Sequence, residues 1–177
     1  MAVINNAVPE LKARTIKIIK EEVYKDVNAL SYKYAEAIAP EMKRVGDAFN
    51  AASDTADKLD LRIIQRGLEY RDAKLRELLD FALEEEEIIL VDNTVDTEST
   101  ELIYNLKVDA LIDDKMLKPL AITMNRYLYS GVLYDWYSKS MGMKQAQVYE
   151  AELMDIENSM VSVLRSSRVR RPLQPKI

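Results

Sequence analysis

The strongest constraint on the fold is an apolar stripe with helical spacing near the C-terminus. Apolar side chains recur at alternating steps of three and four residues, at Ala146, Tyr149, Leu153, Ile156, Met160 and Val163. Such steps place side chains on one face of an α-helix, close to the heptad seam of packed helices. The stripe predicts a helix over about 144–166.

A second predicted helix, over about 114–141, precedes it, with Gly142 suited to a left-handed position after its end. Because few residues join the two helices, we expect an antiparallel hairpin over 114–166.

Two longer helices are predicted in residues 9–86. The first runs from about Pro9 to Ala39, since Pro9 fits a first helical turn and Pro40 a stop. Its apolar positions again follow steps of three and four, at Ile16, Ile19, Val23, Val27, Leu30, Tyr34 and Ala37. A short helical piece follows in 40–49. The second long helix spans about Ala56 to Glu86, and Arg71 interrupts its apolar stripe of Leu61, Ile64, Leu68, Leu75, Leu78 and Ala82.

The pattern changes over residues 88–108, where β-branched residues flank an Asp-Asn-Thr turn signal. We expect a strand at Ile88–Val91 and a short β-hairpin or extended loop around Asp92–Thr100, within 88–108. Residues 101–111 fit a helix and a second strand equally. The predicted fold class is therefore all-α: one helical-bundle domain over 1–167, with an extended basic arm over 168–177.

The composition removes several functional classes. The chain has no cysteine and no histidine, which excludes zinc sites built on those ligands, cysteine nucleophiles and Ser-His-Asp triads. No glycine-rich phosphate loop occurs, so we predict no catalytic residue, no cofactor and no metal. No apolar run approaches the roughly 20 residues of a membrane span, and the first residues lack a signal-peptide pattern. We expect a soluble protein in a cytoplasm-like setting, without a membrane partner.

Charge is distributed unevenly along the chain. Residues 84–164 carry 6 basic and 16 acidic side chains, whereas residues 165–177 carry 5 basic and none acidic. The acidic middle opposes general nucleic-acid binding, which needs a basic face. Its densest stretch is expected to form a solvated or partner-facing surface rather than a cation site, and comprises Glu84, Glu85, Glu86, Glu87, Asp92, Asp96 and Glu98.

Aromatic side chains gather in the predicted C-terminal hairpin. Because they spread over several helix faces with few basic neighbours, core packing together with a protein interface is favoured over stacking on nucleic-acid bases. The set comprises Tyr127, Tyr129, Tyr134, Trp136, Tyr137 and Tyr149.

The end of the chain, "SSRVRRPLQPKI", combines arginine with proline. Proline prevents continuation of the preceding helix and favours extended geometry in the residue before it. The segment is interpreted either as an unstructured terminus or as an arm that docks on a partner. The docking residues would be Arg165, Arg168, Arg170, Arg171, Pro172 and Pro175.

Residues 100–172 combine a Tyr- and Leu-rich helix ("YLYSGVLYDWYSKS"), a short turn, a helix of the pattern "YxxELxxI" and an "R-x-R-R-P" tail. In this combination they resemble the head–tail adaptor (connector) proteins of tailed bacteriophages. The matching residues are Tyr127, Leu128, Leu133, Trp136, Tyr149, Leu153, Ile156, Leu164, Arg168, Arg170 and Arg171.

This resemblance implies a non-enzymatic helical subunit of a homo-oligomeric ring, twelve-fold in that family, below the portal at the virion neck. Assembly would take place in the host cytoplasm, with other tail or neck proteins as neighbours. Double-stranded DNA would pass through the ring without sequence-specific binding during genome ejection, along acidic walls. The terminal arm would lock onto the portal or onto a neighbouring subunit. The alternative interpretation is a cytosolic helical-bundle or coiled-coil module that binds a protein partner.

Overall fold

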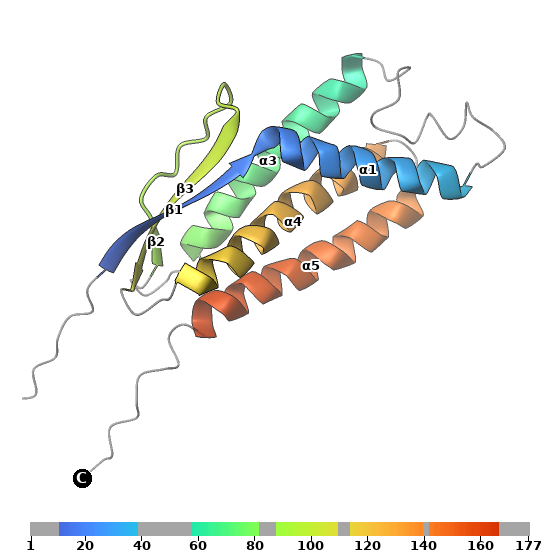
Figure 1. Cartoon of the computed structure of the whole chain (residues 1–177). Coiled ribbons are helices and arrows are strands. Elements are labelled where there is room, and N and C mark those ends of the chain that lie inside the picture. The colour runs from blue at the N-terminus through green and yellow to red at the C-terminus, as the bar shows by residue number, and fades with distance from the viewer. Residues whose placement is uncertain (1–10, 39–57, 82–87, 110–113, 140–141, 167–177) are drawn as a thin grey trace, which may run out of the picture.

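The computed structural model describes residues 11–38, 58–81, 88–109, 114–139 and 142–166. Its elements are β1 (Leu11–Ile19), α1 (Lys20–Ile38), α3 (Lys58–Phe81), β2 (Ile88–Leu90), β3 (Glu101–Asp109), α4 (Asp114–Lys139) and α5 (Met143–Ser166). The chain is mostly helical and carries a small antiparallel sheet (Figure 1). The predicted helical piece in 40–49 and the arm at 168–177 lie outside the described residues.

The prediction of one unbroken helix from Pro9 to Ala39 is wrong. Residues 11–19 form β1, and only Lys20 onward is helical. In β1 the buried side chains alternate, with Ile16 and Ile18 in the core, whereas Ile19 is 42% exposed. This is the two-residue period of a strand with one covered face. The helical stripe therefore begins at Val23.

The sheet has the order β1-β3-β2, and both pairings are antiparallel. The expected strand near 88 is confirmed as β2, and the segment that fitted helix and strand equally is β3. Ile16 lies opposite Tyr104 and Ile18 opposite Leu102 on the buried face. On the other face, the Thr15 hydroxyl donates a hydrogen bond to Asn105 Oδ1 at 2.9 Å, and Lys17 Nζ forms an ion pair with Glu101 Oε2 at 3.1 Å. Cross-strand polar pairs on one face and apolar pairs on the other fix the register.

The C-terminal hairpin has the predicted helices, α4 and α5, with bounds within two residues of expectation. Gly142, however, lies outside the left-handed region. Glycine is required there because an added Cβ would lie 2.8 Å from Cδ1 of Tyr137. The Gly142 amide donates to the Tyr137 carbonyl at 3.0 Å, which closes the end of α4.

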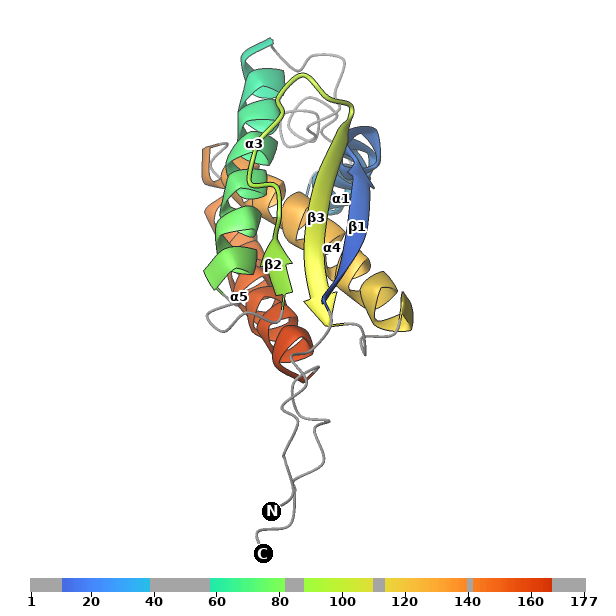
Figure 2. The same ribbon diagram turned by 90° about the vertical axis from the view of Figure 1, so that its left-hand side faces the viewer.

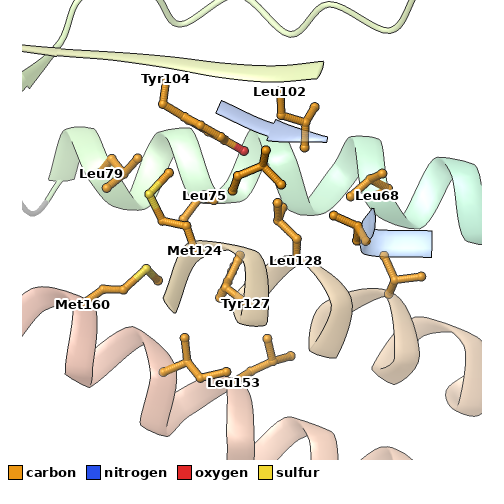
Figure 3. Close-up of a cluster of buried hydrophobic side chains, with 14 of the residues drawn as sticks. Leu68, Leu75, Leu79, Leu102, Tyr104, Met124, Tyr127, Leu128, Leu153 and Met160 are labelled. Carbon is orange, nitrogen blue, oxygen red and sulfur yellow. The ribbon is translucent and has the colours of Figure 1, made fainter. Parts of the chain in front are cut away.

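Helix α4 is the centre of the fold, because α1, α3 and α5 all pack against it (Figures 1 and 2). Its buried residues include Met124, Tyr127 and Leu128, which lie between side chains of α3 and α5 (Figure 3). Leu102 and Tyr104 of β3 point toward the same core from the sheet side (Figure 3). One core therefore joins helices and sheet.

Candidate interaction surfaces

Four of the six aromatic side chains singled out in the sequence are almost fully buried: Tyr127, Trp136, Tyr137 and Tyr149. The Tyr137 ring stacks on Tyr149 with ring centroids 5.8 Å apart, and makes a T-shaped contact with Tyr34 with ring centroids 4.9 Å apart. Aromatic pairs in these geometries add about 0.5–1.5 kcal/mol beyond their buried area. The cluster thus packs α1, α4 and α5 together. Of the six, only Tyr129 and Tyr134 keep a partly exposed surface.

The acidic stretch is described only in part, since residues 84–87 lie outside the described residues. Asp92, Asp96 and Glu98 lie in the segment between β2 and β3, where Asp92 is half-buried and the other two are exposed. Asp92 Oδ1 accepts the Thr94 amide at 2.8 Å, and this hydrogen bond holds the pKa of Asp92 below its ordinary value. Asp96 Oδ1 accepts the amides of Glu98 and Ser99 at 3.0 and 3.1 Å. These carboxylates therefore shape a turn-rich loop.

A buried ionic network, which the sequence did not reveal, holds this loop on the helices. Arg76 Nε donates to both carboxylate oxygens of Asp72, at 3.1 and 3.2 Å, and both residues are buried. The Tyr104 hydroxyl donates to Asp72 at 2.6 Å. The remaining Arg76 nitrogens donate to the carbonyls of Asp92 and Ile103, at 3.0 and 3.1 Å. One arginine thus ties α3 to the loop and to β3, and each buried charge is paired and hydrogen-bonded.

Lys20, at the junction of β1 and α1, also holds the loop through hydrogen bonds. Its ammonium donates to the carbonyls of Asp96 and Thr97, at 3.0 and 3.4 Å. Its amide donates to the Thr100 carbonyl at 3.0 Å. The loop 91–100 is therefore anchored from α3 and from the β1–α1 junction, and it presents Asp96 and Glu98 in a fixed position.

A groove between α3 and α4 is the other notable surface. It is lined by Arg66, Gly67, Tyr70, Arg71, Tyr134, Asp135 and Lys139. Arg71, which interrupts the apolar stripe of α3, pairs with Asp135 at 2.9 Å. Its guanidinium lies 5.3 Å from the Tyr70 ring centre and 5.4 Å from that of Tyr134. Cation–π contacts of this kind hold the two rings around the arginine.

The groove depends on Gly131 in α4. A Cβ added there would lie 2.7 Å from Cγ and Nε of Arg71. The Arg71 side chain therefore crosses α4 where no side chain stands. Arg66 and Tyr70 belong to a row with Arg62 and Lys74 that recurs every four residues in the sequence. This spacing carried a signal for part of the groove, but the signal is not distinctive on its own.

The predicted docking arm is described only at its base. Arg165 belongs to the last turn of α5, and Arg168, Arg170, Arg171, Pro172 and Pro175 lie outside the described residues. Among the described residues, no group of three acidic side chains is placed to hold a metal ion. No helix in the described ranges is long and apolar enough to cross a membrane.

Comparison of the chain with protein-family models, curated proteins and solved structures finds no match.

Proposed function

We propose that this chain is a structural head–tail connector subunit of a tailed bacteriophage. In this proposal it forms an oligomeric ring, twelve-fold by resemblance, below the portal and around the DNA channel, and catalyses no reaction. It would belong to the virion neck, after assembly in the host cytoplasm next to other tail or neck proteins.

The observation that carries the proposal is the α4–α5 hairpin. The eight described positions of the resemblance are Tyr127, Leu128, Leu133, Trp136, Tyr149, Leu153, Ile156 and Leu164, and each is at most 7% exposed. The shared pattern is thus the set of side chains that packs this hairpin. A rigid hairpin of two long helices is suited to lateral packing of subunits in a ring.

The position of the hairpin also supports the docking role of the arm. Helix α5 ends at Ser166, at the same end of the molecule as the start of β1 (Figures 1 and 2). A segment of eleven residues follows, with four basic side chains, namely Arg168, Arg170, Arg171 and Lys176. An extended segment of that length spans up to roughly 35 Å. It would reach the portal or a neighbouring subunit from a rigid base.

The alternative, a protein-binding helical module outside a virion, has one observation in its favour. The outer faces of α4 and α5 expose large apolar side chains, including Ile122 at 60%, Val148 at 56% and Met154 at 59%. Exposed apolar side chains also mark interaction sites outside rings.

The deciding experiment is mass spectrometry of purified particles from a culture that produces this chain. We expect peptides of the chain in intact particles, at several copies per portal ring. Intact particles that lack the chain, while it is present in the cell lysate, would favour the helical module and refute the connector.

The role of the arm is tested by incorporation of variants into particles. Deletion of residues 168–177 is expected to abolish incorporation. Two further variants separate charge from extended geometry: Arg168, Arg170 and Arg171 changed to Gln, and Pro172 and Pro175 changed to Ala. Normal incorporation of the truncated chain would rule out the docking arm without affecting the connector assignment.

A further inference from the structure

Helix α3 carries a row of basic and aromatic side chains on its exposed side. Arg62, Arg66, Tyr70 and Lys74 follow one another at four-residue steps and are all exposed. At about 1.5 Å rise per residue the row spans roughly 18 Å. Arg62 and Arg66 have no ion-pair partner among the described residues, whereas Lys74 pairs with Glu77 at 2.6 Å. We call this row, together with Lys139, the basic stripe.

The basic stripe continues onto α4 through the groove described above. Lys139 lines that groove with Arg66 and Tyr70. Below them, Arg71 is neutralised by Asp135 and holds the rings of Tyr70 and Tyr134. Tyr70 is 53% exposed in spite of these contacts. A supported tyrosine flanked by arginines has the composition of the energetically dominant centres of protein interfaces.

A surface of opposite charge is held rigidly elsewhere on the same chain. The loop 91–100 exposes Asp96 and Glu98, and the anchors from Arg76 and Lys20 fix its backbone. In one molecule the loop faces the Gln65, Glu69 and Asp72 side of α3. Helical periodicity places the basic stripe roughly a third of a turn away from that side. Within one chain, the basic stripe and the acidic loop therefore lie on different sides of α3 and do not contact each other.

We infer that the basic stripe binds the acidic loop 91–100 of a second copy of this chain. The inference rests on the proposed function, which requires contact between subunits, and it names the two surfaces that meet. The contact is head-to-tail, since each copy gives its stripe to one neighbour and its loop to another.

The charge and composition favour this occupant over nucleic acid. The whole chain carries a net charge of −5, which repels a polyanion approaching from a distance. The basic stripe is also short, and four cations release few counterions from DNA. A short acidic protein loop has the complementary charge.

The test uses the absence of cysteine from the chain. Ala73→Cys places a thiol on the exposed side of α3 within the basic stripe, and Thr97→Cys places one on the exposed part of the loop. One variant carries an affinity tag, so that mixed and identical dimers differ in mass. Full-length chains are mixed at about millimolar concentration and oxidised. We expect mixed disulfide dimers to exceed the dimers that each variant forms alone.

Charge reversal then tests the assigned residues. Arg66→Glu in the Ala73→Cys chain, or Glu98→Lys in the Thr97→Cys chain, should each lower the mixed dimer about two- to five-fold, as expected for partly exposed ion pairs. The two reversals together should restore it. Lys33→Glu on the exposed side of α1 is the matched control and should have no effect.

Two results would overturn the inference. One is a mixed dimer no more abundant than the identical dimers. The other is a mixed dimer unaffected by both reversals. Salt-sensitive binding of duplex DNA, lost with Arg66→Glu and unaccompanied by mixed dimers, would assign the stripe to nucleic acid instead. Mixed dimers from a chain absent from virions would support the contact while refuting the connector.

Discussion

At position 131 a side chain of any size would displace Arg71. The arginine crosses α4 at this glycine, pairs with Asp135 and supports two tyrosine rings. Gly67, on the facing helix, differs, because a Cβ there would have its nearest neighbour, Asp135 Oδ2, at an ordinary 3.6 Å. A side chain is therefore excluded by a clash at position 131 but not at position 67, and alanine substitution at each position tests this difference.

Gly131→Ala is expected to lower the free energy of unfolding by about 1–2 kcal/mol. Overpacking costs about 1–3 kcal/mol, and the better helix propensity of alanine returns up to about 1 kcal/mol. Gly67→Ala should raise the free energy of unfolding by up to about 1 kcal/mol, because only the propensity gain applies. Urea denaturation of both variants measures the difference. Equal effects at the two positions would contradict the assigned role of Gly131.

At the scale of elements, two adjacent isoleucines distinguish the observed strand from the predicted helix. Ile18 is 5% exposed and Ile19 is 42% exposed. Ile18→Ala should cost about 2–4 kcal/mol, as for a buried core truncation. Ile19→Ala should cost less than about 1 kcal/mol. In a continuous helix over 9–39, with Ile16, Ile19 and Val23 on its inner face, Ile19→Ala would cost more stability than Ile18→Ala. Thermal or urea denaturation of the two variants decides between them.

The same segment shows where sequence reasoning reached its limit. Steps of three and four from Ile16 to Val23 fit a helix, yet a two-residue alternation also runs through Ile16 and Ile18. The outcome is decided by pairing with β3, about 90 residues away, which no local pattern encodes. Helices α4 and α5 were predictable because their stripes pack against each other across a short connection.

The candidate surfaces also differ in how far the sequence alone could predict them. Burial of the aromatic cluster could be anticipated, because it follows from helical spacing and residue size. The Asp72, Arg76 and Tyr104 network could not be anticipated, since Tyr104 lies 32 residues from Asp72 in the sequence and reaches it from the sheet, in the folded chain. The four-residue spacing of the basic stripe on α3 was visible in the sequence. The exposure of its side chains and the path of Arg71 across α4, which distinguish it from an ordinary solvated face, are visible only in the structure.

For the whole molecule, the buried and half-buried tyrosines set an alkaline limit of stability. Burial is the largest cause that raises the pKa of Tyr24, Tyr104, Tyr127, Tyr129, Tyr137 and Tyr149. Above about pH 10 these groups lose protons in the unfolded chain but keep them in the folded one. The folded state then binds more protons than the unfolded state, so stability falls as pH rises.

We expect the free energy of unfolding to fall above about pH 10, by up to about 1.4 kcal/mol per pH unit for each such tyrosine. Tyr137→Phe is the informative variant, because the Tyr137 hydroxyl is buried without a hydrogen-bond partner among the described residues. It should reduce the alkaline slope while leaving stability at pH 7 nearly unchanged. Urea denaturation between pH 7 and 11 measures both, and an unchanged slope would contradict the prediction.

The pairing of β1 with β3 also sets an order of events during synthesis. Residues 11–19 leave the ribosome about 90 positions ahead of their partner residues 101–109. At about 5–20 residues per second, the first strand waits roughly 5–20 s before it has a partner. During that interval its backbone is open to pairing with other nascent chains. Lys12, Arg14 and Lys17 place positive charge along this strand, and like charges oppose such pairing until β3 emerges.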